Sequence, residues 1–331
     1  MQLTTLVSLP EIPVSVTYET PVFLIGSCFS DVLGNRLNER KFSVLSNPFG
    51  TVYNPASINR MIQSILDNHV PEADDIQHHN GIYFHPDYHS DVSAMSRHET
   101  LTRIQLATEN AHEFLQKASC IFITFGTAIV YREKKSDQVV ANCHKLPADR
   151  FVKKLLSIDD ICRDSEKMIR NLREKCPDIP IVFTVSPVRH IRDGLIENNR
   201  SKARLLEAVH LLSENLPGVY YFPSYELVMD QLRDYRFYEK DMIHPNELAH
   251  DVVWEMFSDT FFDVKTKQII FRIEKIMMAF RHRPRFDQHP DYGLFCRKQI
   301  IDIDALKSCI PTEKLGEERV YFLSKSGLSQ D

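Results

Sequence analysis

The sequence predicts an α/β protein in which a five-stranded parallel sheet is flanked by helices. Between residues 21 and 262, short apolar runs rich in β-branched and aromatic residues alternate five times with longer segments of helical spacing. Polar or glycine-containing stretches follow most of these runs. This alternation is typical of parallel sheets, whose ligands bind beyond the carboxyl ends of the strands. The stretches after the strands therefore contain the candidate site residues.

Each predicted strand is a short buried run that ends at turn residues. The first extends from Val22 to Ile25 and stops at Gly26, and the clearest is Cys120–Phe125, which stops at Gly126. The five runs are 22–25, 42–45, 120–125, 180–185 and 218–222. The spacing of apolar residues predicts a helix after Cys28 and further helices at 56–67, 99–117, 157–175, 198–215 and 246–261. Residues 130–131 and 139–140 are expected to form a small hairpin.

Two segments fall outside this alternation. Residues 68–97 contain histidines at positions 69, 78, 79, 85 and 89, among prolines and aspartates, which indicates an irregular insertion. Beyond residue 262 a helix from about 265 to 282 is followed by a polar, weakly patterned remainder. We therefore expect a main domain over residues 1–262 and a C-terminal helical extension over 263–331. The extension is expected to pack on the body or on a partner, so a homo-oligomer formed through it is one expectation.

The composition argues against several classes of protein. Hydrophobic residues make up 43% and charged residues 26% of the 331 residues, as in ordinary globular proteins. The formal net charge of −5 provides no basic field for nucleic acid, and no apolar run is long enough to span a membrane. The N-terminus lacks the features of a signal peptide, and the seven scattered cysteines include no C-x-x-C pair. We expect a cytoplasmic protein with reduced thiols, no bound metal and no cofactor.

The stretch Gly26-Ser27-Cys28 places a hydroxyl and a thiol at the carboxyl end of the first strand. The helix that follows directs its N–H groups and the positive end of its dipole at any charge that develops there. The alternative is a structural joint, in which Gly26 permits the turn and Ser27 caps the helix. Taken alone, the stretch favours the joint.

A second candidate feature is Asp241-Met242-Ile243-His244-Pro245, directly before the last predicted helix. A carboxylate can hold the tautomer of a histidine and stabilise the imidazolium that forms when the ring accepts a proton. By spacing alone, such a pair more often caps and decorates the start of a helix. Its place near the end of an α/β chain that begins with Gly26-Ser27-Cys28 favours a catalytic pair.

These stretches resemble the signature of the GSCFA family, which belongs to the wider SGNH, or GDSL-like, hydrolase superfamily. The resemblance extends from residue 21 to about 262 and rests on residues 26–30, 47–51, 125–128, 142–145, 186–190 and 241–245. It implies a three-layer α/β/α fold of the flavodoxin-like kind. It also implies a nucleophile after the first strand, oxyanion donors from two further loops, and an Asp–His pair near the C-terminal helix.

The superfamily's first block, Gly-Asp-Ser, leaves two candidates for the nucleophile. Aligned without a gap, Cys28 falls on the nucleophilic serine, whereas a slip of one residue places Ser27 there. A thiol beside a helix N-terminus and a histidine can ionise near neutral pH, while Ser27 would need His244 as a full general base. The ungapped alignment favours Cys28 as the nucleophile, and Ser27 stays a candidate. Asp241 and His244 match the final block without gaps.

The resemblance is less complete for the oxyanion donors. Gly50 matches the glycine of the second block, whose backbone N–H would face an oxyanion. The third block should read Gly-x-Asn, but this chain has Gly126-Thr127-Ala128 and lacks the asparagine. We expect Asn142 or His144, from the hairpin that follows, to take its place.

Together these features predict an acyl-ester hydrolase or acyltransferase that forms a covalent acyl-enzyme with a small acyl group of a carbohydrate or lipid-like substrate. Arg189 and His190 follow the fourth predicted strand and are candidates for binding an anionic or hydroxyl-rich substrate, or are surface groups at a strand end. His144 is a further candidate for substrate binding. The expected partner is therefore a small-molecule ester. One alternative is a weakened SGNH-fold binding or regulatory protein, which the missing asparagine supports. A second is a metal-dependent phosphoesterase that uses the histidines of the insertion.

Overall fold

The structure is a computed structural model that describes residues 4–286 and 289–327 of the chain. The contacts divide the chain into two compact units. The first comprises Met1–Val14, Pro21–Gly34 and Val44–Thr260, and the second comprises Ser15–Thr20, Asn35–Ser43 and Phe261–Asp331. The second unit thus includes two short segments from the N-terminal part of the chain in addition to the expected C-terminal extension.

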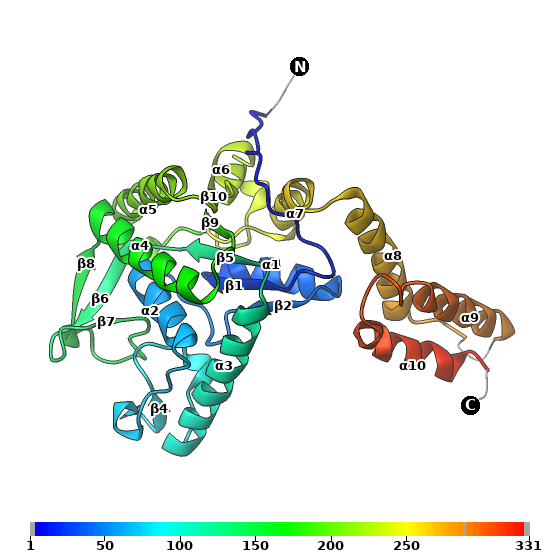
Figure 1. Cartoon of the computed structure of the whole chain (residues 1–331), viewed down its shortest axis with the longest axis horizontal. Helices are drawn as coiled ribbons and strands as arrows, with labels where there is room; N and C mark the ends of the chain where they lie inside the picture. Colours follow the sequence, from blue (N-terminus) through cyan, green and yellow to red (C-terminus); the bar gives the residue numbers. More distant parts are fainter. Residues whose placement is uncertain (1–3, 287–288, 328–331) are drawn as a thin grey trace. The chain divides into compact units, whose positions relative to one another are not determined.

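The first unit is built on a five-stranded parallel sheet, as the sequence predicts (Figure 1). Its strands lie in the order β10-β9-β5-β1-β2, and every neighbouring pair is parallel. This is the 2-1-3-4-5 order of flavodoxin-like folds, in which the chain reverses its direction of winding between the first and third strands. The strands are β1 (Val22–Gly26), β2 (Val44–Ser46), β5 (Cys120–Phe125), β9 (Ile181–Val185) and β10 (Val219–Tyr221).

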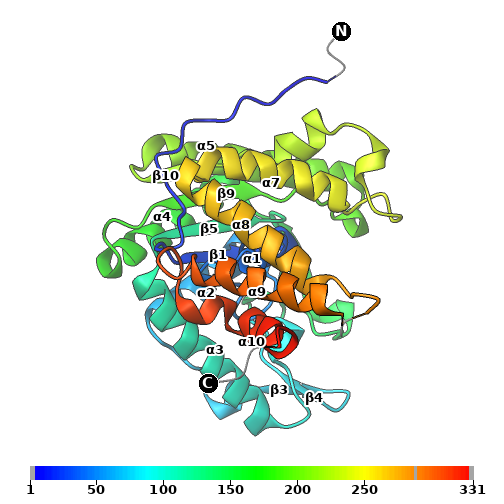
Figure 2. The same ribbon diagram turned by 90° about the vertical axis from the view of Figure 1, so that its right-hand side faces the viewer.

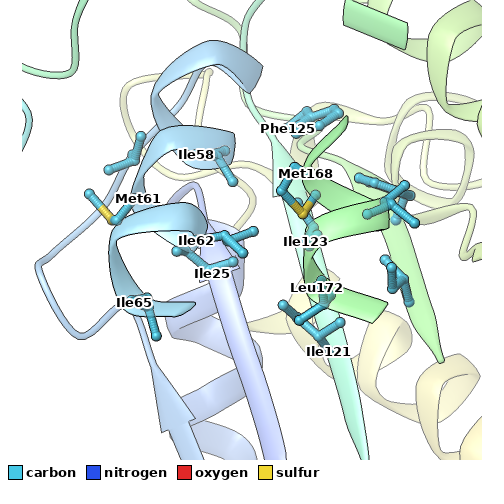
Figure 3. Packing of buried hydrophobic residues seen from close by; sticks show 14 of the residues in the cluster. Ile25, Ile58, Met61, Ile62, Ile65, Ile121, Ile123, Phe125, Met168 and Leu172 are labelled. Carbon is cyan, nitrogen blue, oxygen red and sulfur yellow. The ribbon is translucent and has the colours of Figure 1, made fainter. Parts of the chain in front are cut away.

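Helices cover both faces of the sheet, which confirms the predicted three-layer α/β/α architecture. Alternate strand residues such as Ile25 and Ile123 face a layer in which α2 packs against α3 and α4, and α4 packs against α5 (Figure 3). On the other face Phe122 contacts Phe257 of α7, and Ser30 of α1 donates a hydrogen bond to Thr124. The helices are α1 (Cys28–Glu39), α2 (Pro55–Leu66), α3 (Arg97–Lys117), α4 (Ile158–Lys175), α5 (Leu195–Asn215) and α7 (Glu247–Phe261).

The expected hairpin after β5 belongs to a three-stranded antiparallel sheet. Strand β6 (Ile129–Glu133) pairs with β7 (Val139–Val140) on one side and with β8 (Phe151–Leu155) on the other. The pairing of β6 and β7 was predicted. Strand β8 was not, because its central residues are exposed and charged and leave only a weak alternating pattern.

The segment expected to be irregular contains some regular structure. Short 3-10 turns, Ala73–Asp75 and Ser90–Val92, flank an antiparallel pair made of β3 (Gln77–His79) and β4 (Ile82–Phe84). Ile76, Tyr88 and Val92 of this segment join the main core cluster. The segment is therefore packed against the main core through apolar side chains. Its polar composition gave no sign of this packing.

Short turns connect the last strand to α7. They are α6 (Ser224–Glu226), a π-turn at Leu227–Gln231 and a 3-10 turn at Tyr235–Phe237. The second unit contains α8 (Val264–Arg281), α9 (Pro290–Asp304), a 3-10 turn at Thr312–Leu315 and α10 (Gly316–Lys325). Helices α9 and α10 lie side by side (Figure 2), and Phe280 of α8 packs edge-on against Phe322 of α10. None of the described helices combines the length and the apolar character that a membrane span requires.

Candidate active site

The candidate site lies at the point where the winding of the sheet reverses. Strands β1 and β5 are neighbours there, and their carboxyl ends lead into Gly26-Ser27-Cys28 and Gly126-Thr127-Ala128. Parallel α/β sheets bind ligands in the crevice at this position. Gly26 has a φ of +139°, and a Cβ atom there would lie 2.2 Å from the carbonyl oxygen of Thr124. Glycine is required at this turn because a side chain would collide with the neighbouring strand.

A cavity of about 440 Å³ opens at this edge of the sheet. Its volume is in the range of small-molecule sites. Cys28 and His244 both line it, although they are far apart in the sequence. The other residues of its wall come from the start of α2, from β6 and β7, and from the loop after β9. They are Tyr53, Asn54, Thr127, Ile129, Tyr131, Val140, Ala141, Cys143, Ser186, Val188, Arg189, His190, Ile191, Arg192, Asp193 and Ile243.

The structure separates the two candidate nucleophiles. Ser27 is 1% exposed and does not belong to the cavity wall, and its hydroxyl accepts the backbone N–H of Phe29 at 3.4 Å. Ser27 therefore occupies the capping position of α1. Cys28, the next residue, is partly exposed and lines the cavity. The geometry supports the ungapped alignment, in which Cys28 takes the place of the nucleophile.

The electrostatic surroundings of Cys28 act in opposite directions. Burial raises the pKa of the thiol, and the nearby carboxylate of Asp31 raises it further. Lys202 and the backbone N–H groups of Cys28 and Phe29 lower it. Because the net shift is upward, the thiol needs a base to supply the thiolate at neutral pH.

Asp241 and His244 form the predicted pair. His244 Nδ1 lies 2.6 Å from Asp241 Oδ2, and the other carboxylate oxygen accepts the backbone N–H groups of Ile243 and His244 at 2.9 and 3.0 Å. The hydrogen bond from the His244 ring is the largest of the effects that lower the pKa of Asp241 to about 2. The carboxylate is thus ionised at neutral pH and holds the proton on Nδ1, so that Nε2 is the basic nitrogen.

The predicted oxyanion donors do not line the cavity. The backbone N–H of Gly50 donates to the carbonyl of Asn47 at 2.8 Å, so it is already engaged in a turn. Glycine is needed there because a Cβ atom would lie 2.6 Å from the His89 side chain. The side-chain oxygen of Asn142 accepts the backbone N–H of His144 at 2.8 Å, which closes a local turn. The donor roles expected for Gly50 and Asn142 are revised accordingly.

His144 is likewise held away from the cavity. Its Nε2 lies 3.1 Å from the carbonyl oxygens of both His85 and Tyr88, and its ring stacks on Phe84 at 4.2 Å. The ring ties the hairpin after β5 to the segment that contains β3 and β4. Burial lowers the pKa of His144 to about 4, so the ring is neutral at physiological pH. These contacts engage the ring in the structure, and His144 is not among the residues that line the cavity, where a donor or substrate-binding role was expected.

We predict that protonation of His144 destabilises the fold in mild acid. Its pKa is about 4 when folded and about 6.5 when unfolded, so the unfolded chain binds the extra proton between these values. The stabilisation is present above pH 6.5 and is lost as the pH falls toward 4. The test measures the unfolding free energy with urea at about pH 7.5 and at about pH 5 and takes the difference between the two values. This difference should be smaller for His144→Gln than for the wild type. An unchanged difference would refute this role.

Two arginines give the cavity a cationic wall. Arg189 was predicted and Arg192 was not, and both line the cavity. No carboxylate in the described part of the chain forms an ion pair with either guanidinium, whereas Asp193, the carboxylate of the wall, is paired with Lys153. Arg189 lies over the ring of Tyr238 at 5.8 Å. Two arginines without a carboxylate partner among the described residues favour an anionic group in the ligand.

His190 lies in the cavity wall as predicted, but in the neutral state. Burial, with smaller effects of the nearby Lys202 and His244, lowers its pKa to about 4. Its backbone N–H donates to Asn198 at 2.9 Å, and its ring meets that of Tyr53 edge-on at 5.4 Å. A neutral imidazole can donate or accept a hydrogen bond but does not attract anions as a cation does.

Asn54 is a site residue that the sequence reasoning missed. It is 5% exposed and lines the cavity. Its Oδ1 accepts the backbone N–H of Ser57 at 2.8 Å and so caps helix α2. This bond fixes the orientation of the amide, and its NH₂ group has no acceptor among the residues that the structure describes. The signal was present in Asn54-Pro55, which is typical of a helix start, but a capping residue is not normally considered as a donor to a ligand.

Helix α5 contributes a buried polar face that was also missed. Asn198 accepts the N–H of His190, Ser201 accepts the N–H of Ala128 at 2.7 Å, and Lys202 donates to the carbonyls of Gly126 and Ser186 at 2.6 Å each. These bonds hold the loops that follow β5 and β9. Helical spacing places Asn198, Ser201 and Lys202 on the same face as Leu205, where an apolar residue is the rule.

The fold and the site define an α/β protein with a thiol, an imidazole and a carboxylate gathered at the carboxyl edge of a parallel sheet. The chain belongs to the GSCFA family, which it matches over residues 21–257. A search of curated proteins finds no significant match. This match confirms the resemblance to the GSCFA family, and the matched range contains Cys28, Asp241 and His244.

Proposed function

We propose that this protein is an SGNH-type acyl-ester hydrolase or acyltransferase with Cys28 as its nucleophile. The observation that carries the proposal is that the Cys28 thiol and the His244 imidazole line one cavity, while Asp241 holds the imidazole at 2.6 Å. A nucleophile, a base and a group that orients the base are the parts of a catalytic triad, which is recognised by geometry and not by sequence order.

In the proposed reaction, His244 accepts the thiol proton and the sulfur forms a bond to the ester carbonyl carbon. The carbonyl electron pair moves to the oxygen, which the N–H of Cys28 and the amide of Asn54 stabilise. The C–O ester bond then breaks, and the leaving alkoxide takes the proton from His244. Water, or the hydroxyl of an acceptor in the transferase version, attacks the thioester while His244 accepts its proton. The thiolate leaves and recovers that proton.

The wall of the cavity supports a substrate with two chemical parts. Ile129, Val140 and Ala141 supply an apolar surface for a small acyl group, and Arg189 and Arg192 suit an anionic group elsewhere in the molecule. All seven cysteines are free, which is consistent with work in a reducing, cytoplasmic compartment. A carbohydrate or lipid-like acceptor and a homo-oligomer formed through residues 263–331 stay predictions.

Acyl-enzyme formation tests the proposal directly. Incubation with p-nitrophenyl acetate should release a burst of nitrophenol and leave an acetyl group on the Cys28 peptide, as peptide mass spectrometry would report. His244→Ala should slow the burst by roughly a hundred-fold or more, because it removes the general base. Cys143 lines the same cavity and serves as the control thiol. Acetylation of Cys143 and Cys28 at equal rates, or a burst that does not depend on His244, would contradict the proposal.

The same experiment separates the alternatives. A weakened binding or regulatory protein, which the missing third-block asparagine favours, would show neither burst nor acetylation. A metal-dependent phosphoesterase would instead hydrolyse p-nitrophenyl phosphate in a parallel assay, and a chelator would abolish that hydrolysis. In the described part of the chain no three His, Cys, Asp or Glu side chains gather in a way that could hold a metal ion.

A further inference from the structure

Lys202 is a fully buried lysine held against the loops that follow β5 and β9, and burial lowers its pKa to about 7. Its side chain is 1% exposed, and Nζ lies 2.6 Å from the carbonyl oxygens of both Gly126 and Ser186. These carbonyls directly follow β5 and β9, the two strands whose loops form the cavity wall on this side. Two carbonyl dipoles satisfy two of the three ammonium protons, but they do not neutralise the charge.

No carboxylate neutralises Lys202 within the ranges that the structure describes. Its electrostatic neighbours include Cys28, Arg189 and the His190 ring, of which Arg189 is itself a cation. A buried ammonium without a counter-ion is costly, and proteins normally pair such a charge or replace it with an apolar residue. An anion that forms beside this lysine during function would stabilise its ammonium form.

Cys28 is the group near Lys202 that can supply this anion. Ser27 bonds to Thr124 of β5, two residues before Gly126, so the turn that carries Cys28 lies beside the carbonyl that Lys202 holds. Lys202 lowers the pKa of the Cys28 thiol, and a Cys28 thiolate raises the pKa of the lysine, which burial alone depresses. Asp31 acts against the thiolate from the other side.

We infer that Lys202 is the buried counter-ion of the Cys28 thiolate and acts as a positioning residue that stabilises the negative charge of the nucleophile. In this arrangement His244 removes the thiol proton and Lys202 stabilises the charge that remains on sulfur. The inference rests on the proposed function only in taking Cys28 as the nucleophile. It concerns the ionisation of the thiol and not the identity of the ester.

A purely structural role for Lys202 is the rival explanation. In that case the ammonium would only join the loops after β5 and β9 through its two hydrogen bonds. Two variants distinguish these roles. Lys202→Met removes both the charge and the donors, whereas Lys202→Gln removes the charge and keeps an NH₂ group that can donate to the carbonyls.

The test is the rate at which iodoacetamide alkylates Cys28 as a function of pH, read peptide by peptide with mass spectrometry. Both variants should shift the rise of the Cys28 profile to higher pH, because removal of the positive charge removes an effect that lowers the pKa of the thiol. The rate below that rise should fall about three- to four-fold for each pH unit by which the profile moves, because the higher intrinsic nucleophilicity of a more basic thiolate offsets part of the loss of thiolate.

Two other cysteines provide internal references. Cys143 lines the same cavity, and its charged neighbour is Arg192 and not Lys202, so its profile should stay unchanged. Cys120 is 1% exposed on β5 and should stay unreactive in any variant that folds. If Lys202→Gln keeps the wild-type Cys28 profile while Lys202→Met does not, the lysine only joins the loops after β5 and β9 through its hydrogen bonds, and the inference is wrong. Equal Cys28 profiles in all three proteins would overturn it as well.

The result of the alkylation experiment is independent of the result of the acyl-enzyme experiment that tests the proposed function. Alkylation reports the ionisation of the thiol even if the wild-type protein hydrolyses no ester. Conversely, an acyl-enzyme on Cys28 in the wild type would support the proposed function even if both Lys202 variants alkylate normally.

Discussion

Exchange of Cys28 for alanine is expected to reduce ester turnover to the uncatalysed background while leaving the fold intact. Removal of the nucleophile from a triad typically costs on the order of a million-fold in kcat. Cys28 is the first residue of α1 and is partly exposed, and alanine suits a helix, so the stability should change little. Steady-state hydrolysis of p-nitrophenyl acetate and urea unfolding of the same preparation measure the two effects.

Ser27→Ala is the matched control for this prediction, and it should give the opposite result. It removes the hydroxyl that accepts the N–H of Phe29, so the free energy of unfolding should fall by about 0.5–2 kcal/mol, as for the loss of a helix cap. Turnover should stay within a few-fold of the wild type. If Ser27→Ala is the inactive variant and Cys28→Ala keeps its activity, the assignment of the nucleophile is reversed.

Replacement of Asn54 by serine is expected to lower kcat about a hundred- to a thousand-fold, the usual cost of one oxyanion donor. The amide NH₂ of Asn54 is a donor in the cavity wall that has no acceptor within the described residues, while its Oδ1 accepts the backbone N–H of Ser57. Serine can still cap α2 through its hydroxyl, so the unfolding free energy should change by no more than roughly 0.5 kcal/mol. KM should change little if the donor acts mainly in the transition state.

A second substitution separates donor loss from cap loss at Asn54. Asn54→Ala should lose the same factor in kcat and in addition about 0.5–2 kcal/mol of stability, because the cap of α2 disappears. Comparison of the two variants by kinetics and by urea unfolding isolates the role of the amide. Wild-type kcat in Asn54→Ser would exclude Asn54 as an oxyanion donor and would return attention to the other groups of the wall.

Much of the fold could be predicted because it depends on local patterns. The buried run at Cys120–Phe125 has no polar residue except Thr124, and the apolar spacing in α2 is clear, so the core elements were found near their observed bounds. Strand β8 was missed because Lys153 and Lys154 interrupt its alternation. The packing of Ile76 and Tyr88 into the core was missed because each lies among charged and polar neighbours.

The pairing of Asp241 with His244 could be inferred from the sequence for the same reason. Only two residues lie between them, and the turn that joins them is closed by backbone N–H groups that donate to the carboxylate. A short loop leaves few alternative geometries, so spacing alone carries information about contact. The family signature at residues 26–30 was equally local, and the match over residues 21–257 confirms the family that it indicated.

Local sequence determined the order of the elements, the position of the turn at Gly26 and the pairing of Asp241 with His244. Only the tertiary structure decided which of two adjacent side chains enters the cavity, because Ser27 and Cys28 leave the same turn in different directions. It also turned Asn142 and His144 away from the site and brought Asn54 and Lys202 to it. His144 and Lys202 depend on hydrogen bonds to backbone carbonyls of distant segments, which leave no pattern in the sequence. Asn54 and Asn142 are fixed by local turns, but whether these turns line the cavity depends on how distant segments pack.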